Sequence, residues 1–397
     1  MKILTLNCGS SSIKYAVFFK EKRIAFGKVE RIGERSSIIK YSSEKKSFEK
    51  EAKVSTYVRA FNIMINNLTN KEFGVIKSKK EINAVGHRVV HGKELHESII
   101  IDKFVLRKIK KLFDVAPLHN PHNYKGIITA KKLFPKIPHV AVFDTAFHNT
   151  LPEIAYLYAL PQEYYKKYGI RRYGFHGISH KYVAHEAAKM LRKPLNKLKM
   201  ITCHLGAGSS ITAINKGKSV DTSMGFTPLE GLIMCTRSGD VDPGLHYLKR
   251  HVWEGQKNFY DILNKKSGLL GISGKSKDMR VLWKNYNKDK NCRLAVNMYS
   301  YRLLKYLGSY IAILNGVNAI VFTAGIGENA YYVRKKVCDK LRYCGVILDE
   351  KKNRKTINGK TGFINTKNSK VKILVIPTDE EKMIALETKK TIKGKIK

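Results

Sequence analysis

The sequence has few of the features that mark secreted, membrane-embedded or zinc-binding proteins. Its six cysteines are scattered and form no CxxC pair, which argues against a zinc site. The N-terminus offers only Lys2 and a short apolar run, too little for a secretory signal. Because scattered cysteines without such a signal are typical of a reducing compartment, we expect a cytoplasmic protein.

Long hydrophobic runs are also missing. The most apolar later stretch, residues 310–327, contains Asn315, Gly316 and Asn318, so we expect no membrane span and no membrane partner. A length of 397 residues with a hydrophobic fraction of 43% suits a globular protein of two domains, each with its own core.

Acidic residues are scarce relative to basic ones. The 75 Lys and Arg residues against 32 Asp and Glu give a formal net charge of +43, which is an argument for a polyanionic partner. The basic residues are spread over nearly every connecting segment, however, and not gathered between aromatic readers. This pattern favours a basic, solvated surface with no specific nucleic-acid partner. A nucleic-acid-binding protein remains the alternative, and it requires clustered charge.

What the sequence does contain is a repeated glycine–serine turn between apolar strands. Residues 200–214 read MITCHLGAGSSITAI, and residues 3–19 read ILTLNCGSSSIKYAVFF. Glycines allow a backbone to approach a bulky anion, and neighbouring N–H groups and hydroxyls bind it. Two copies this far apart favour a duplicated α/β domain in which each half offers a loop to phosphate. Two unrelated hairpins are the alternative on these stretches alone.

Three further segments place chemically active groups after predicted strands. Arg88 follows a strand at residues 82–86, and a planar guanidinium beside glycine suits a small carboxylate. Asp144 sits at the carboxyl end of a strand at residues 139–143, where open α/β sheets bind ligands. The glycine-rich turn at residues 323–329 follows a strand and leads into a helix, which suits the base and ribose of a nucleotide.

Other segments favour a local, structural interpretation. His87 is expected to be structural and not catalytic. Asn120 before a proline predicts a helix cap, and Thr378 with Glu381 predicts a capping box for the last helix. Residues 221–243 form a long irregular stretch rich in Gly, Pro, Thr and Asp, and such stretches are usually functional.

In their order along the chain, nine strings make the sequence resemble the acetate kinase family of the sugar kinase/Hsp70/actin superfamily. Between Asn7 and about Glu381 they are NCGSSSIKY, HRVVHG, APLHNP, FDTAFH, RYGFHG, HLGAGSS, DTSMGFTPLEG, TRSGDVDP and FTAGIGEN. The resemblance implies an α/β fold of duplicated actin-like ATPase (ribonuclease H-like) domains with an interdomain cleft. It implies an N-terminal domain at residues 1–149 joined by a C-terminal helix at 385–397, a nucleotide-binding domain at residues 150–384, and a homodimer.

The resemblance also implies an activity. This is reversible, in-line transfer of the γ-phosphoryl group of ATP to acetate, giving acetyl phosphate and ADP, with Mg²⁺ as cofactor and Mn²⁺ as a substitute. Phosphoryl transfer needs alignment and charge stabilisation more than covalent help. A carboxylate acceptor is already ionised at neutral pH, so no strong base is required. We therefore expect Asp144 to orient acetate or the waters of the metal.

The same resemblance implies roles for single residues. The catalytic residues are Asp144, His176 and Arg237, and the metal residues are Asn7 and Glu380. The acetate-binding residues are Arg88 and an apolar pocket of Val90, Leu118, Phe175 and Pro228. The nucleotide-binding residues are Ser10, Ser12, Lys14, His204, Gly206, Ala207, Gly208, Gly325, Ile326, Gly327 and Asn329.

The chain departs from the family pattern at Ala207, where the family has asparagine, and at Cys235, where it has glycine. Losing one hydrogen bond to phosphate costs about 1–3 kcal/mol, so we expect a working but slower enzyme. A relic that binds nucleotide without catalysis is one alternative. A kinase of propionate or another short-chain acid is a second, because one methylene is worth only about 1–3 kcal/mol.

Overall fold

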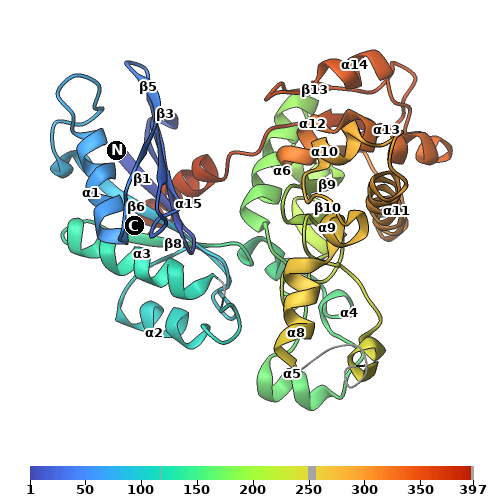
Figure 1. Cartoon of the computed structure of the whole chain (residues 1–397), viewed down its shortest axis with the longest axis horizontal. Helices are drawn as coiled ribbons and strands as arrows, with labels where there is room; N and C mark the ends of the chain where they lie inside the picture. The colour runs from blue at the N-terminus through green and yellow to red at the C-terminus, as the bar shows by residue number, and fades with distance from the viewer. Residues whose placement is uncertain (118, 249–255, 395–397) are drawn as a thin grey trace. The chain divides into compact units, whose positions relative to one another are not determined.

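The chain forms two compact units. The computed structural model describes residues 1–117, 119–248 and 256–394. Unit 1 comprises Met1–Phe147 and the segment that begins at Asp379, and unit 2 comprises His148–Thr378. In Figure 1 the blue start of the chain and its red last helix therefore belong to one unit. The sequence pattern places these two boundaries at residues 149 and 385.

Unit 1 is built on an eight-stranded sheet of order β5-β4-β3-β2-β1-β6-β8-β7. Its strands are β1 Lys2–Cys8, β2 Ser12–Phe19, β3 Lys22–Glu30, β4 Ser37–Ser43, β5 Ser47–Ala52, β6 Ile82–Val89, β7 Ile99–Ile100 and β8 His139–Phe143. Its helices are α1 Tyr57–Leu68, α2 Lys103–Lys111, α3 Asn120–Leu133 and α15 Glu380–Gly394, with short 3₁₀ turns at Lys79–Glu81 and Ala146–Thr150.

Successive side chains of the central strands point to opposite faces of the sheet, and both faces are apolar. Leu4 and Leu6 of β1 join the core that α1 and α3 cover, whereas Ile3 packs with Ala385 of α15. Figure 1 shows α15 lying against the strands of unit 1, so the end of the chain covers a face that its beginning forms. This arrangement brings Glu380, the first residue of α15, to the edge where β1, β6 and β8 end.

Unit 2 repeats the central topology of unit 1. Its sheet has the order β11-β10-β9-β12-β14-β13. In both units an antiparallel three-stranded meander is followed by two strands that run parallel to its first strand. The strands are β9 Lys199–Leu205, β10 Ser209–Asn215, β11 Lys218–Thr222, β12 Ala319–Thr323, β13 Gly362–Phe363 and β14 Lys372–Val375.

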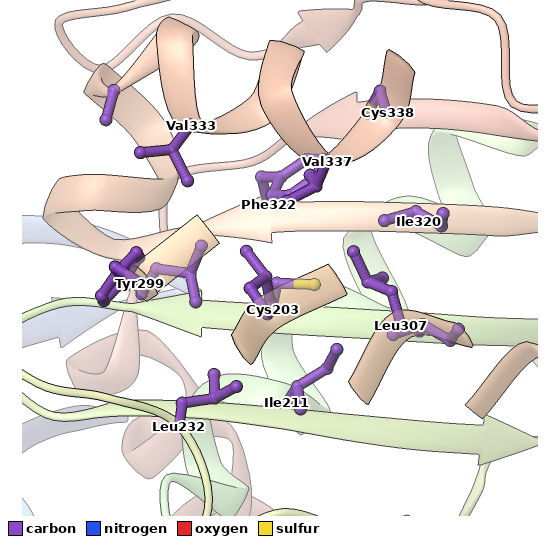
Figure 2. Close-up of a cluster of buried hydrophobic side chains, with 14 of the residues drawn as sticks. Cys203, Ile211, Leu232, Tyr299, Leu307, Ile320, Phe322, Val333, Val337 and Cys338 are labelled. Atoms are coloured by element: carbon purple, nitrogen blue, oxygen red, sulfur yellow. The ribbon is translucent and has the colours of Figure 1, made fainter. Parts of the chain in front are cut away.

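Helices enclose the sheet of unit 2. They are α4 Glu153–Tyr156, α5 Gln162–Tyr168, α6 Gly177–Leu191, α8 Gln256–Asp261, α9 Gly268–Ser273, α10 Met279–Lys284, α11 Lys290–Ile313, α12 Ala324–Asn329, α13 Tyr331–Cys338 and α14 Glu350–Lys355, with short 3₁₀ or π turns at Leu195–Lys197, Pro243–Leu248, Ile262–Lys266 and Asp339–Cys344. Figure 2 shows the core between this sheet and α11 and α13, where the strand side chains meet those of the helices: Cys203, Ile211, Ile320, Phe322, Tyr299, Leu307, Val333 and Val337.

Two local predictions are wrong, and both fail because a tertiary contact takes the side chain. Asn120 does not cap α3: its amide group exchanges hydrogen bonds with the backbone N–H and C=O of His91, at 3.1 and 3.0 Å. The first turn of α15 is capped by Asp379, which accepts from the Lys382 N–H at 2.9 Å. The hydroxyl of Thr378 bonds to Ser179 instead.

The structural interpretation of His87 is confirmed. Its ring is buried, and its Nε2 lies 2.9 Å from Nδ1 of His139, whose Nε2 lies 3.0 Å from the Phe134 carbonyl. Among the described residues, no helix is both long enough and apolar enough to cross a bilayer.

Gly86 of β6 sets how closely α15 approaches the sheet. A Cβ at this position would lie 2.2 Å from Thr388 Oγ1 and 2.8 Å from Ile384 Cγ2, both buried in α15. We expect Gly86→Ala to destabilise unit 1 by about 1–3 kcal/mol, because the overpacked helix must move. Urea unfolding monitored by circular dichroism measures this loss. Gly308→Ala in α11 is the matched control: its Cβ would meet nothing within 4 Å, so an equal loss there would contradict the interpretation.

Candidate active site

Four polar side chains of unit 1 meet where its parallel strands end. Strands β1, β6 and β8 run parallel to one another, so their carboxyl ends share one edge of the sheet. Asn7 lies near the end of β1, Arg88 near the end of β6, and Asp144 directly after β8. Glu380 joins them from the first turn of α15.

The guanidinium of Arg88 is the centre of this group. Its Nε and Nη2 donate to the Asp144 carboxylate, at 3.1 and 2.6 Å from Oδ2. Its Nη1 lies 3.5 Å from Asn7 Oδ1, and its Nε lies 3.8 Å from Glu380 Oε2. One edge of the guanidinium therefore faces Asp144. This contact fixes the plane of the guanidinium, whose remaining N–H groups are then oriented to donate to a second planar carboxylate.

Burial and charge act against each other in this pair. Burial lowers the pKa of Arg88, but the charges of Asp144 and Glu380 outweigh that effect and raise it above its ordinary value. Burial raises the pKa of Asp144, whose side chain is only 2% exposed, and the Arg88 charge and hydrogen bonds oppose this rise. Removing either partner would leave a buried, uncompensated charge.

The donor set around Arg88 has the chemistry of a magnesium site. Asn7, Asp144 and Glu380 offer amide and carboxylate oxygens, which Mg²⁺ prefers, and Mg²⁺ usually completes its shell with water and substrate phosphates. Within the described ranges, no group of three or more His, Cys, Asp or Glu side chains is placed to hold a metal ion alone. The residues present therefore fit a metal that is bound together with a phosphate ligand.

In unit 2 the glycine turn between β9 and β10 lies beside a histidine and an arginine. A Cβ at Gly208 would lie 3.3 Å from Nε2 of His176 and 3.4 Å from Nη1 of Arg237. These two groups border a space at Gly208, which we call the glycine cradle. The sequence predicts this turn as a phosphate loop, and the cradle offers what a phosphoryl group needs: donors on two sides and no side chain in the way.

Arg237 is half-buried, and its hydrogen bonds run to neutral acceptors. Its Nη1 donates to the Pro228 carbonyl at 3.2 Å and contacts the Met234 sulfur at 3.5 Å. No Asp or Glu of the described residues forms an ion pair with it. Burial lowers its pKa, yet a guanidinium stays protonated in proteins. A cation of this kind has the chemistry to stabilise an anion.

His176 is held in an uncommon backbone conformation. It is the N-cap of α6 with φ +55°, and Gly174 and Gly177 flank it. A histidine at positive φ is strained, and such strain gathers at functional sites. Its ring stacks on His204 with centroids 4.1 Å apart. Phe175, the preceding residue, is buried, and its carbonyl lies 3.0 Å from His148 Nε2.

The predicted turn at residues 323–329 is the short helix α12, which lies beside the glycine turn. Strand β12 pairs in parallel with β9, and a Cβ at Gly206 would lie 3.5 Å from that of Ala324. Gly325, Ile326, Gly327 and Asn329 belong to α12. They therefore lie in the same unit as His204, Gly206, Ala207 and Gly208, at neighbouring strand ends.

The remaining predicted residues that the structure describes lie in unit 1. Ser10, Ser12 and Lys14 lie in the β1–β2 hairpin of unit 1, where the Gly9 N–H bonds to the Ser12 carbonyl. Val90 is buried directly after β6. Leu118 lies outside the described residues.

Ala207 and Cys235, two of the positions that depart from the family pattern, contact each other. The Cys235 N–H donates to the Ala207 carbonyl at 3.2 Å, and the Cys235 thiol lies 3.9 Å from the Gly206 carbonyl. Burial raises the pKa of this thiol. Cys235 therefore holds the glycine turn through a backbone hydrogen bond and a thiol contact.

Comparison with known proteins identifies the family. The model of the acetokinase family matches residues 2–386. The chain belongs to the acetokinase family. An acetate kinase of Thermotoga maritima is 52% identical over 400 residues, which cover 99% of either chain. Among solved structures, an acetate kinase of Porphyromonas gingivalis has a TM-score of 0.92 at 43% identity, and a propionate kinase of Francisella tularensis 0.91 at 42%; each match covers 98% of this chain and 99% of the other. The predicted fold is thereby confirmed.

Several residues that support the site were not found from the sequence. Arg334 has no exposed surface and donates to the carbonyls of Gly327 and Glu328 in α12, and to the side chain and carbonyl of Asn353. Burial lowers its pKa to about 10. A buried arginine gives no periodic signal that distinguishes it from a surface one. His180, which lies four residues after His176 on the first turns of α6, does give such a signal.

His148 makes the stability of unit 2 dependent on pH. Burial lowers its pKa from the ordinary 6.5 to about 4, so the unfolded chain takes up this proton before the folded chain does. The contribution to stability is complete above pH 6.5 and is lost as the pH falls toward 4, by up to about 3 kcal/mol.

We therefore expect His148→Gln to reduce the slope of unfolding free energy against pH between 6.5 and 4, measured by urea titration at each pH. Gln cannot titrate in this window, and its amide still reaches the Phe175 carbonyl. His246→Gln, at an exposed position, is the control and keeps the wild-type slope. Parallel slopes for His148→Gln and the wild type would contradict the interpretation.

Proposed function

We propose that this chain transfers the γ-phosphoryl group of ATP to acetate, giving acetyl phosphate and ADP, and runs the reverse reaction with the same groups. Membership of the acetokinase family over residues 2–386 supports this activity. The observation that carries it is the glycine cradle, where Arg237 and His176 border Gly208, a position without a side chain. A charge that no described carboxylate neutralises suits a substrate with several negative oxygens.

The two units divide the substrates in this proposal. In unit 1, Arg88 binds the acetate carboxylate and Val90 contributes to the methyl pocket. In unit 2, Phe175 and Pro228 are the apolar residues assigned to the acetate methyl group, and the residues of the glycine turn and α12 bind the nucleotide. Ser10, Ser12 and Lys14 of the first hairpin contribute donors to the phosphates.

The chemical step makes one bond and breaks one. An acetate oxygen attacks the γ-phosphorus, a C–O–P bond forms, and the bond to the β-phosphate oxygen breaks, so that ADP leaves with the electron pair. Acetate is ionised at neutral pH and needs no base. The residues supply alignment and charge: Arg237 and His176 donate to the equatorial oxygens, and Asp144 holds Arg88 in the plane that orients acetate.

Asn7 and Glu380 are the residues proposed to hold Mg²⁺ or Mn²⁺, with Asp144 bonded to its waters. When bound together with ATP, the ion would supply positive charge that neutralises the phosphate groups. Their oxygens around Arg88 support this assignment.

Propionate is the second candidate acceptor. The likeness to the propionate kinase of Francisella tularensis, at 42% identity, is the observation that favours it. A pocket that accepts a methyl group rejects one more methylene by only about 1–3 kcal/mol. The two acids therefore share the same proposed site, and Arg88 binds either carboxylate.

We also propose a homodimer that works in a reducing cytoplasm. The described part of α11 exposes Leu294, Met298 and Tyr301 at helical spacing, and such a stripe is typical of a contact surface. A monomer mass by light scattering would exclude the dimer.

The six cysteines carry free thiols, which supports the reducing compartment.

A panel of short carboxylic acids tests the function directly. With ATP and Mg²⁺, we expect the purified protein to form acyl hydroxamate from acetate in the presence of hydroxylamine. We expect kcat/KM to fall from acetate through propionate to butyrate, by about 10-fold or more per methylene, because a site that fits a methyl group discriminates against each added methylene. No acyl phosphate from any of the acids would overturn the proposal. A higher kcat/KM with propionate would favour the second candidate.

Asp144→Asn tests the role of the ion pair. We expect the KM for acetate to rise about 10-fold or more and kcat to fall, because Arg88 loses the charge that fixes its plane. Glu380→Gln is expected to raise the Mg²⁺ concentration at half-maximal rate instead. Steady-state kinetics with acetate and Mg²⁺ varied in turn separates the two effects. Asp339→Asn, which changes an exposed carboxylate, is the control and is expected to keep the wild-type constants. If Asp144→Asn behaves like this control, Asp144 has no part in binding acetate.

A further inference from the structure

A buried chain of hydrogen bonds leads away from His176. Its Nδ1 lies 2.9 Å from Ser210 Oγ, which lies 2.7 Å from His180 Nε2. Nδ1 of His180 lies 2.7 Å from Thr202 Oγ1. Ser210, His180 and Thr202 have no exposed surface, so water does not interrupt the chain. We call these three residues the hydroxyl relay.

The fold brings the relay together from three elements. His176 is the N-cap of α6 and His180 lies in its first turn, and both rings reach Ser210 Oγ. That helix packs on β9, which carries Thr202, and β9 pairs with β10, which carries Ser210. Burial lowers the pKa of His180 well below 6.5, and the neighbouring rings of His148 and His204 lower it further. His180 is therefore neutral, with one N–H donor and one bare nitrogen acceptor.

Counting protons fixes the direction of the relay. Thr202 Oγ1 makes one hydrogen bond among the described residues, the one to His180 Nδ1. Its hydroxyl proton must go there, because an unpaired buried donor is strongly unfavourable. His180 then carries its own proton on Nε2 and donates it to Ser210 Oγ. The proton of Ser210 remains, and its acceptor is Nδ1 of His176.

This direction determines what His176 presents to the glycine cradle. We propose that the hydroxyl relay holds His176 neutral with its proton on Nε2, so that it donates a hydrogen bond to the transferred phosphoryl group. The inference rests on the proposed function, in which the cradle receives that group. Nε2 and the neighbouring Cε1 are the two ring atoms that would lie 3.3 Å from a Cβ at Gly208, so this edge of the ring faces the cradle. Ser210, His180 and Thr202 are thus positioning residues: none of them touches the substrate.

Protonation of His176 on both nitrogens would break this pattern. Nδ1–H would then point at Ser210, which would receive two donors and have no acceptor for its own proton. The stack of His176 on His204, with centroids 4.1 Å apart, also disfavours a second charge there. Arg237 consequently supplies the positive charge of the cradle, and His176 supplies a directed donor.

Nitrogen NMR of the full chain tests the relay without reference to catalysis. In protein labelled with ¹⁵N-histidine, the imidazole shifts distinguish a protonated nitrogen from a bare one, and His176→Gln identifies the signals. We expect His176 at neutral pH to carry its proton on Nε2. We expect Thr202→Val to give a mixture of the two neutral forms, and Thr202→Ser to restore the single form. A wild-type His176 with its proton on Nδ1, or with both nitrogens protonated, would overturn the inference.

Kinetics supplies the second readout. Removing one whole transition-state donor costs about 10²–10³-fold in kcat, so losing control over its proton is expected to cost about 10-fold. Thr202→Val should show this loss in kcat with the KM values for ATP and acetate unchanged, and Thr202→Ser should recover it. Thr212→Val is the matched control: Thr212 is equally buried on β10 and bonds to Thr222 at 2.9 Å, outside the relay. Equal kcat values for Thr202→Val and Thr212→Val would overturn the inference.

The two tests separate failure of the relay from failure of the proposed function. If the cradle does not receive the phosphoryl group, His176→Gln keeps the wild-type kcat while the NMR pattern still holds. If the relay is wrong, the NMR pattern fails whatever the kinetics show. Should Thr202→Val fold poorly, Ser210→Ala interrupts the same chain at its next member and is judged by the same two readouts.

Discussion

The structure of the site depends on a guanidinium that is half-buried with only neutral partners. Arg237 donates to the Pro228 carbonyl and borders Gly208, where the backbone carries no side chain. Burial of an unpaired charge is unfavourable in isolation, and proteins retain such charges where a ligand completes the pair. The strained backbone of His176 and its ordered hydrogen bonds make sense beside this cation. In the proposed function, donors that are already oriented would meet the anion with little reorganisation.

The two units use the same topology for opposite electrostatic situations. In each unit, neighbouring parallel strands end at one edge and bring functional groups together. In unit 1 the cation is matched by carboxylates, since Arg88 is held by Asp144 and lies near Glu380. That arrangement suits acetate, which carries a single charge, together with a metal ion. In unit 2 Arg237 has no described carboxylate partner, which suits a phosphoryl group with several charged oxygens.

The sequence predicted the parts of the site that are written in short, local patterns. The paired glycine hairpins, the strand before Asp144 and the glycine-flanked His176 all have signals within a few residues, and the confirmed fold follows from their order. The two helix-cap predictions were wrong because an asparagine or threonine side chain can form its hydrogen bond with a distant backbone group or hydroxyl as well as with a nearby one. Asn120, for example, accepts from the backbone N–H of His91. The relay and Arg334 escaped notice because their partners are far apart in sequence and become neighbours only through strand pairing. The assigned roles of the site residues remain predictions.

Calorimetric titration of Gly208→Ala with ATP and Mg²⁺ tests the central claim most directly, which is that the glycine cradle is an anion site. A methyl group there would lie 3.3 Å from His176 and 3.4 Å from Arg237, in the space that phosphate oxygens would need. The account predicts a folded protein whose affinity for ATP is at least about 10-fold weaker, since each displaced charge-assisted hydrogen bond contributes about 1.5–3 kcal/mol. Wild-type affinity together with wild-type kcat in Gly208→Ala would contradict it.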